Sequence, residues 1–438
     1  MVRYSRQSGI STKGSQSGKQ LEGSRKRPLF VAYNMSMYPK LSLKKGREYQ
    51  ILRGHPWLFS GGISQAPSKV QPGAIVDLVD TNGRFVARGY YNPATDIAVR
   101  VLTKNADQSI DAGFFKDRVA AAYALRQMAV DTSTTDAYRL VHAEGDFLPG
   151  YVVDYYAGNL VVQSHTAGAD QLLPQFIEAL KEVVQPKAIV VRNDSSGRRR
   201  EGLEIVPPDV VHGELPNEII IRENNIQFAV DVVSGQKTGF FTDQREKRAG
   251  LQRYAKLLPD NATMLNGFCY TAGFSVYAAL AKPQLKTFNV DESQKALDQG
   301  RRNFELNNIA PSPNHEFIPA DAFPWLEEQK AQHREFDIVL LDPPAFAKSH
   351  KDKPRALKGY SRMNRLGISV TKSGGILVVC SCSGSVTLDE FTACLRDAAA
   401  DQHRDVQILE VFQNGCDHPV SVGAPEGNYL KVLFCRVS

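Results

Sequence analysis

The sequence predicts an α/β protein that ends in an open parallel sheet, preceded by a small β-barrel and an α+β middle segment. From Ser234 onward, short apolar runs alternate with helical segments, which is typical of parallel strands joined by crossover helices. Residues 72–103 instead hold three short alternating strands separated by Pro-Gly, Asn-Gly and Asn-Pro turns. The predicted parts are a basic tail at 1–38, a β-barrel at 39–104, a middle segment at 105–233 and the α/β domain at 234–438.

Length and composition describe a globular chain. At 438 residues it is long enough for two to four domains, and no stretch approaches the apolar length of a membrane span. Six cysteines in so long a chain argue against a disulfide framework and favour a reducing, cytoplasmic location. The two sulfurs of Cys380-Ser381-Cys382 are too close for an ordinary zinc half-site, so no metal is expected.

The net charge of +6 comes from the tail alone. Residues 1–38 hold seven Lys or Arg and one Glu, which leaves 46 basic and 46 acidic residues in the rest of the chain. Any RNA-binding surface must therefore be a local patch. The tail is rich in Ser, Gly and Gln, and we expect it to be disordered. It is either a flexible nucleic-acid arm, a targeting peptide, or sequence upstream of a start at Met35 or Met37.

The barrel segment interleaves basic and aromatic residues. Four cations surround a His-Pro-Trp sequence: Lys44, Lys45, Arg47 and Arg53. Such a pattern is suited to an RNA-binding surface, where the cations contact phosphates and the aromatic rings stack on bases. A basic face that is only solvated explains the pattern nearly as well.

The middle segment predicts helices packed on an antiparallel sheet. Residues 111–130 and 171–184 are amphipathic, and residues 218–233 form a hairpin. Arg198–Arg200 is expected to be an exposed basic triplet, either on a solvated loop or against phosphate.

The C-terminal domain is organised around the strand that ends at Asp342. Ile338–Leu341 is a short apolar run, and Pro343 and Pro344 cannot extend a ladder, so Asp342 lies at the carboxyl end of a buried strand. In an open α/β sheet that edge binds ligands. With Phe346, these residues form a slot that can hold a planar heterocycle.

Three further strand ends predict a nucleoside pocket. Met264–Phe274 breaks into a small-residue turn before a helix, with Gly267 and Gly273 allowing the backbone to approach a ligand. Asp291 can accept hydrogen bonds from ribose hydroxyls, and Asp321 with Phe323 can hold an adenine. A helix-capping acid is the commoner explanation for each alone. A sulfonium cofactor suits such a pocket, because no phosphate must be bound.

The next strand, from Gly375, runs into a pair of cysteines. Its end should lie beside Asp342, because the two strands are expected to be neighbours. A cysteine at an open strand end can have a lowered pKa and act as a nucleophile. Cys380 still belongs to the strand and is expected to be a small buried hydrophobe, whereas Cys382 lies beyond it and is the candidate nucleophile.

The order of these motifs resembles the class I S-adenosylmethionine (SAM)-dependent RNA methyltransferases, which have a Rossmann-like fold. LNGFCYTAGF, FNVDES, DPPAF, GGILVVCSCSG and DHPV…PEGNYLK are most similar to the ribosomal RNA large subunit methyltransferase I family, which makes 5-methylcytosine in large-subunit rRNA. The resemblance covers residues 41–438, and its N-terminal part is similar to that family's RNA-binding PUA domain.

The resemblance implies a methyltransferase that uses SAM to modify ribosomal RNA through a covalent cysteine adduct. Cys382 and Asp342 would be catalytic. The implied cofactor contacts are Gly267, Tyr270, Thr271, Gly273, Asp291, Asp321, Phe323 and Asp342. The implied substrate contacts are Pro343, Pro344, Phe346, Lys44, Lys45, Arg47 and Arg53. A homodimer is one possible oligomeric state.

Two residues depart from the family pattern. Ala272 replaces the first Gly of a Thr-Gly-Gly turn and is expected to add a methyl group near the cofactor. Ala345 stands where a Lys often follows the prolines, so any role of that Lys is absent here.

Three other functions compete with this one. An RNA methyltransferase that acts on guanine or adenine amino groups would use Asp-Pro-Pro without a cysteine. A non-catalytic RNA-binding assembly factor is disfavoured by the complete pocket. A nicotinamide dehydrogenase is disfavoured because the glycine spacing is wrong.

Overall fold

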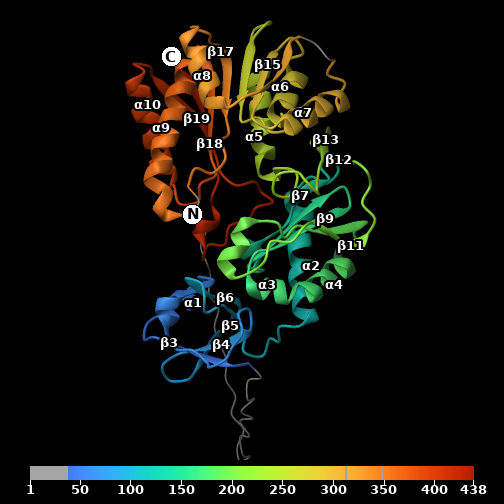
Figure 1. The fold of residues 1–438 in the computed structure, drawn as a ribbon, viewed down its shortest axis with the longest axis vertical. Coiled ribbons are helices and arrows are strands. Elements are labelled where there is room, and N and C mark those ends of the chain that lie inside the picture. Colours follow the sequence, from blue (N-terminus) through green and yellow to red (C-terminus); the bar gives the residue numbers. More distant parts are fainter. Residues whose placement is uncertain (1–37, 311–312, 348) are drawn as a thin grey trace, which may run out of the picture. The chain divides into compact units, whose positions relative to one another are not determined.

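The computed structural model describes residues 38–310, 313–347 and 349–438. The predictions for the tail concern residues outside this range, except for Tyr38. Residues 38–438 form one compact unit, and Figure 1 shows its elements along the chain. No helix in these ranges is both long and apolar enough to cross a membrane.

The N-terminal β domain is a six-stranded sheet with the order β2-β6-β5-β4-β1-β3. Its core is apolar, and Leu41, Leu43 and Val99 are fully buried in it. The predicted strands are β4, β5 and β6, and the sequence did not reveal the short β1–β3 and α1. The elements are β1 (Lys40–Leu43), α1 (Glu48–Leu52), β2 (Trp57–Phe59), η1 (Ser60–Gly62), β3 (Ile63–Gln65), β4 (Ile75–Val79), β5 (Phe85–Tyr91) and β6 (Ile97–Thr103).

The middle segment carries a five-stranded sheet with the order β11-β10-β9-β8-β7. The antiparallel prediction is wrong for one pair: β9 and β10 run parallel, because α3 and α4 cross over between them. The elements are α2 (Ala112–Ala129), β7 (Ala137–His142), η2 (Ala143–Asp146), β8 (Tyr151–Tyr156), β9 (Asn159–Ser164), α3 (Ala167–Gln171), α4 (Leu173–Val184), β10 (Ala188–Val191), η3 (Ser196–Glu201) and β11 (Asp209–Gly213).

The predicted hairpin is present as β12 (Ile219–Glu223) and β13 (Ile226–Val230). Its apolar side packs with residues of the following domain, such as Val276 and Phe304, as well as with the middle sheet. The prediction that Arg198–Arg200 is exposed is wrong for one of the three residues. Arg198 is only 3% exposed and forms an ion pair with Asp170 at 2.9 Å, so the loop curls back onto α3.

The C-terminal domain is a seven-stranded sheet with the order β16-β15-β14-β17-β18-β20-β19. The first five strands are parallel, and β20 is antiparallel to both β18 and β19. Its strands are β14 (Thr263–Gly267), β15 (Lys286–Asp291), β16 (His315–Pro319), β17 (Phe336–Leu341), β18 (Thr371–Ser381), β19 (Val406–Phe412) and β20 (Lys431–Val437).

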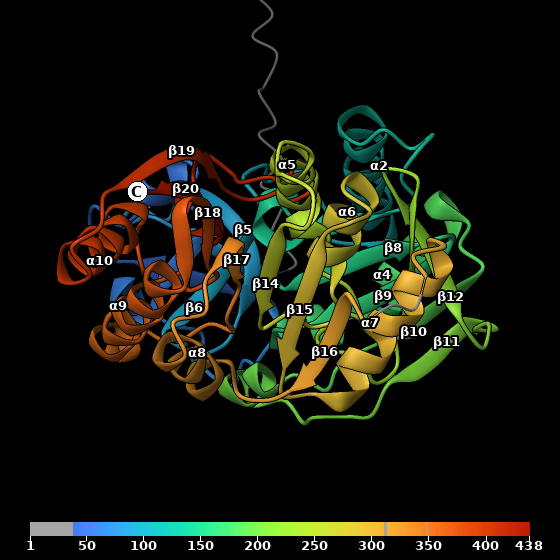
Figure 2. The same ribbon diagram turned by 90° about the horizontal axis from the view of Figure 1, so that it is seen from above.

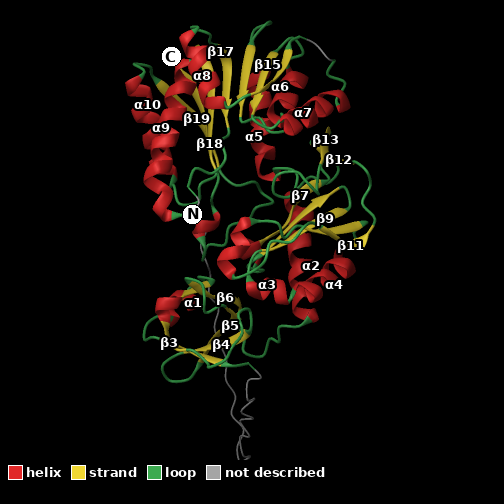
Figure 3. Ribbon diagram, in the orientation of Figure 1, coloured by secondary structure: helices red, strands yellow, loops and turns green. Residues whose placement is uncertain are grey.

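Helices cover both faces of this sheet (Figures 2 and 3). Alternate strand residues divide the core: Leu265 and Val339 pack toward α8–α10, and Met264 and Ile338 toward α5 and α6. The helix α8, which the sequence analysis missed, begins after the capping residue Asp321. The helices are η4 (Thr242–Gln244), α5 (Arg245–Lys256), α6 (Gly273–Ala281), α7 (Gln294–Leu306), α8 (Ala322–Ala331), η5 (His350–Asp352), α9 (Lys353–Ser369), α10 (Leu388–Asp401) and η6 (Pro425–Gly427).

A buried carboxylate joins the middle sheet to the C-terminal domain. Asp417 is 0% exposed and accepts hydrogen bonds from the main-chain N–H of Arg139 at 2.8 Å and from the Arg245 guanidinium at 3.1 Å. The neighbouring His418, the Arg245 charge and the hydrogen bond from the Arg139 N–H keep the pKa of Asp417 well below its usual range, against the effect of burial. The contact fixes β7 beside the start of α5, where the site described next is built.

Candidate active site

A cavity of about 530 Å³ opens at the carboxyl edge of the parallel sheet. Most of its wall comes from residues that follow consecutive strands, as expected for an open α/β sheet. Those residues are Asn266 within the end of β14 and Phe268, Cys269, Tyr270, Thr271 and Gly273 after it, Asp291 at the end of β15 and Glu292 after it, Asp321 and Phe323 after β16, Asp342–Phe346 after β17, and Cys382 after β18.

The turn between β14 and α6 has an unusual backbone. Phe268, Tyr270 and Ala272 have φ angles of 60°, 48° and 57°, a region that costs non-glycine residues about 1–3 kcal/mol each. Tyr270 is held in place by its main-chain N–H, which donates to Asp291 at 2.9 Å, and by its hydroxyl, which donates to Gly239. This fold brings the turn along the floor of the cavity.

Two predictions about this turn are corrected by packing. A Cβ atom at Gly267 would lie 2.8 Å from the Leu341 side chain, so its missing side chain makes room for the neighbouring strand, and Gly267 is not among the cavity-lining residues. Ala272 is fully buried in the core beside Val276, so its methyl group does not face the cofactor side.

The acids after β15 and β16 line the cavity and also hold local turns. Asp291 accepts hydrogen bonds from the main-chain N–H groups of Tyr270 and Ser293 at 2.9 Å each. Asp321 caps α8 by accepting from the N–H of Phe323 at 2.9 Å. Each carboxylate oxygen has a second lone pair, so these caps leave acceptors for a ligand.

The cavity also contains an acceptor without a partner. Asn266 is 1% exposed; its amide N–H donates to Ser275, but its Oδ1 has no hydrogen-bond partner among the described residues. Buried polar atoms are nearly always bonded, so this oxygen suits a donor on a bound ligand. The methionine ammonium of SAM is such a donor, and the acids suit its ribose and adenine.

Asp342 lies where the sequence predicts it, one residue beyond β17. Burial raises its pKa to about 6, the nearby Asp243 carboxylate adds to the rise, and a hydrogen bond from Gln244 Nε2 at 2.8 Å opposes it. A carboxyl group with this pKa exchanges protons near neutrality.

The positions of Cys380 and Cys382 agree with the prediction, but the pKa of Cys382 does not. Cys380 is 0% exposed inside β18, and Cys382 is half-buried, lines the cavity and lies with its Sγ 3.9 Å from the carbonyl oxygen of Pro343. The expectation of a lowered pKa is wrong for Cys382. Burial raises the pKa of Cys382 to about 11, with the Lys237 charge acting in the opposite direction.

The predicted substrate-contact residues fall into two groups. Pro343, Pro344 and Phe346 line the cavity, and the Phe346 ring packs against Tyr360 with centroids 4.7 Å apart. Four basic residues lie in the N-terminal β domain away from this cavity, each with an exposed side chain: Lys44, Lys45, Arg47 and Arg53.

Several lining residues were not predicted. Lys237, Asp243 and Gln244 come from the segment before α5, and Tyr429 comes from the loop before β20. Tyr429 donates a hydrogen bond to Asp243. The polar residue Asn266 inside an apolar strand was a usable signal, whereas nothing in the sequence places Tyr429 beside Asp243.

Comparisons with known protein families agree with this site. A family model for PUA-like domains matches residues 41–104, and one for S-adenosylmethionine-dependent methyltransferases matches residues 192–434. SAM is therefore the cofactor, and the cavity at the sheet edge fits it. The crystal structure of a methyltransferase complexed with SAH shares the fold, with a TM-score of 0.78, 23% identity, and coverage of 91% of this chain and 99% of that one.

Sequence relatives extend over nearly the whole chain. Ribosomal RNA large subunit methyltransferase I of Klebsiella pneumoniae (strain 342) is 40% identical over 403 residues, 92% of this chain and 99% of that protein. The protein of the same name from Escherichia coli O157:H7 is 40% identical over 402 residues, 92% of this chain and 100% of its own length. The chain thus belongs to the ribosomal RNA large subunit methyltransferase I family of SAM-dependent methyltransferases.

Proposed function

We propose that this protein methylates carbon 5 of a cytosine in large-subunit ribosomal RNA, with Cys382 as the covalent nucleophile. The names of the relatives supply the substrate class. The resemblance of the CSCSG and DPPAF motifs supplies the atom that is modified.

The observation that carries the cytosine assignment is the position of Cys382. Its half-buried thiol lines the same cavity as Asp342 and the cofactor acids, whereas Cys380, two residues earlier, is sealed in the core. A methyltransferase that acts on an amino group has no need of a thiol at this place.

Carbon 5 of cytosine is a poor nucleophile, and a thiolate at the neighbouring carbon changes that. When the Cys382 sulfur bonds to C6, the C5–C6 π electrons become available at C5, which then takes the methyl group. Loss of the C5 proton and breakage of the S–C6 bond restore the double bond and return the thiolate. SAM supplies the electrophilic methyl group when it is bound.

Asp342 fits the role of the acid that holds the base. With a pKa near 6 it keeps a protonated fraction at neutral pH, and that form can donate a hydrogen bond to cytosine N3. The target base must leave its stack to reach the cavity, and Phe346 offers a ring at its wall. Pro343 and Pro344 keep this stretch rigid.

The N-terminal β domain is the proposed RNA anchor. Its four exposed cations, Lys44, Lys45, Arg47 and Arg53, form no ion pair among the described residues, and the exposed rings of Tyr49 and Phe59 lie in the same segment. Cations that are free of acidic partners can neutralise RNA phosphates.

Mass mapping of modified nucleosides tests the proposal. Ribosomal RNA from cells with and without the gene is digested and compared. Loss of one 5-methylcytosine from the large-subunit RNA is expected, and its return when the gene is restored. Loss of a methylated guanine or adenine instead would contradict the proposal.

One observation favours the amino-group alternative. Burial raises the pKa of Cys382 to about 11, so the thiol is protonated at neutral pH and must lose its proton during the reaction. An enzyme that methylates an amino nitrogen would tolerate this thiol as a bystander, and would keep its activity in Cys382→Ala.

A further inference from the structure

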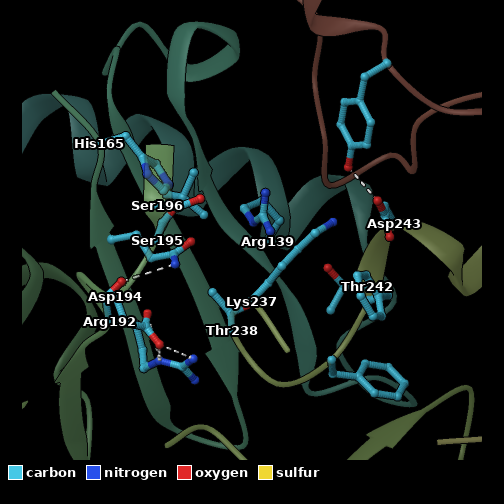
Figure 4. Close-up of a pocket in the computed structure, with 15 residues that line it drawn as sticks. Arg139, His165, Arg192, Asp194, Ser195, Ser196, Lys237, Thr238, Thr242 and Asp243 are labelled. Atoms are coloured by element: carbon cyan, nitrogen blue, oxygen red, sulfur yellow. Dashed lines mark hydrogen bonds and ion pairs between the residues drawn. The ribbon is translucent and has the colours of Figure 1, made fainter. Parts of the chain in front are cut away.

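A second cavity of about 530 Å³ adjoins the cofactor cavity. Part of its wall comes from the middle sheet, with Arg139 from β7 and Arg192 after β10, and part from the segment that leads into α5 (Figure 4). Five residues line both cavities: Lys237, Phe240, Phe241, Asp243 and Tyr429. The two spaces therefore meet beside the segment 237–243.

Lys237 carries the unpaired positive charge of this wall. Among the described residues no ion pair or hydrogen bond reaches its ammonium group, which lies 4.6 Å from the centroid of the Phe241 ring. Its charge acts at longer range on the Asp243 carboxylate and helps to lower the pKa of that group. In Figure 4 the side chain points toward the space between Arg139 and Asp243. Arg139 and Arg192 are instead neutralised by Asp154 and Asp194.

The same wall holds two acceptors that have no donor. Thr242 is 2% exposed and Asp243 is 6% exposed, yet the Oγ1 atom of the first and the Oδ1 atom of the second have no hydrogen-bond partner in the described structure. A buried acceptor without a hydrogen bond costs free energy, so these two atoms indicate a ligand with hydrogen-bond donors.

One ligand that offers an anion and hydroxyl donors a few ångströms apart is a ribonucleotide. We propose that this second cavity binds the ribose and phosphate of the RNA nucleotide whose base enters the cofactor cavity, with the phosphate on Lys237 and the 2′-hydroxyl donating to the Thr242–Asp243 pair. The inference rests on the proposed function only in taking RNA as the substrate, and does not depend on which base atom is methylated. The site would select RNA over DNA, because only ribose has this hydroxyl.

The competing ligand for Lys237 is the carboxylate of SAM itself. The far wall of the second cavity argues against this ligand. Arg139 lies in β7, and His165 and Arg192 directly follow β9 and β10 of the middle sheet; none of the three lines the cofactor cavity. A cofactor bound along Asp291 and Asp321 has no need of this space. The experiment below separates the two ligands.

The test compares Lys237→Gln with Lys256→Gln, a matched change of an exposed lysine on α5 that lines neither cavity. Binding of a short ribosomal RNA fragment is measured at several salt concentrations, SAM binding is measured by calorimetry, and methyl transfer is counted without regard to the modified atom. For Lys237→Gln we expect RNA affinity to fall about fivefold to tenfold and the slope of log K against log salt to shrink by roughly 0.7–1. SAM affinity should stay within about twofold, and Lys256→Gln should change none of these values.

Unchanged RNA affinity and slope in Lys237→Gln would overturn the phosphate assignment. A loss of SAM affinity with RNA binding intact would overturn it in favour of the cofactor carboxylate. The hydroxyl contact is tested in the wild type with an RNA that has a single 2′-deoxy substitution at the methylated nucleotide. We expect this RNA to lose about fivefold or more in kcat/KM, and an equal kcat/KM would remove the hydroxyl from the site. If the product proves to be an N-methylated base, the proposed function fails while all these measurements keep their meaning.

Discussion

The two cavities that meet at residues 237–243 are built in different ways. The cofactor cavity takes most of its wall from residues that directly follow β14–β18, so the topology of one parallel sheet assembles it. The second cavity takes its wall from the middle sheet, the segment before α5 and Tyr429, so it exists only once the middle and C-terminal parts have packed together. The first cavity should therefore hold the ligand common to the fold, and the second the ligand specific to this family.

The largest expected effect separates the two cysteines in the first cavity. Cys382→Ala should lower methyl transfer at least about a thousandfold, because it removes the nucleophile, with SAM affinity unchanged. Cys380→Ala should keep activity and reduce the free energy of unfolding by roughly 1 kcal/mol, the cost of a small buried group. Single-turnover rates and thermal melting measure both variants. An active Cys382→Ala enzyme would leave the amino-group alternative as the better account.

The next effect concerns pH and the raised pKa values of the same cavity. The reactive form needs a protonated Asp342, whose fraction falls tenfold per pH unit above about 6, and a Cys382 thiolate, whose fraction rises tenfold per unit up to about 11. The product of the two fractions is constant between the two pKa values and falls below the lower one. We therefore expect kcat/KM to rise up to about pH 6 and to stay constant above it. Asp342→Asn removes the falling factor, so its lower rate should climb roughly a hundredfold between pH 6 and pH 8. A wild-type rate that keeps climbing from pH 6 to pH 8 would rule out a protonated Asp342.

Asp291 tests whether the first cavity binds the cofactor independently of RNA. Asp291→Ala should weaken SAM binding by about 1–3 kcal/mol, the range for a hydrogen bond to a charged acceptor. Its RNA affinity should not change, which is the opposite of the pattern expected for Lys237→Gln. Calorimetry with SAM and RNA binding on the same samples compare the two; unaltered SAM affinity would take Asp291 out of the site.

The smallest effect per residue is expected in the N-terminal β domain. Replacing Lys44, Lys45, Arg47 and Arg53 together with Gln should lower RNA affinity at least about tenfold and reduce the salt slope by roughly 0.7–0.9 for each RNA phosphate that is no longer neutralised. The exposed positions of these side chains make a folding defect unexpected, and melting temperature checks this. If RNA affinity and the rate of rRNA methylation stay at wild-type values, the second cavity and its surroundings bind the RNA without this domain.

The contrast between the cavities also explains what the sequence could predict. The sequence could predict that Asp291, Asp321, Asp342 and Cys382 line one cavity, because each lies at or just beyond the end of a strand of one sheet, where chain order and spatial order are linked. Lys237 and Tyr429 could not be found in this way, because they meet through packing of distant segments.

Local geometry accounts for the smaller errors. The parallel pair β9–β10 was missed because its crossover helices were interpreted as a layer on an antiparallel sheet. Ala272 was placed near the cofactor because sequence does not show that a positive φ turns its methyl group into the core. The thiol pKa of Cys382 was misjudged because it depends on the depth of burial, and strand position alone does not give that depth.

The covalent adduct is the most direct test of the central claim, that Cys382 attacks C6 of a cytosine. RNA carrying 5-fluorocytosine at the target position cannot lose a proton from C5, so the reaction should stop after methyl transfer with the protein bonded to RNA. Denaturing gels and peptide mass mapping should show an adduct that requires SAM and is located on Cys382, and Cys380→Ala should form it as well. An adduct that is absent from the wild type, or that persists in Cys382→Ala, would contradict the account.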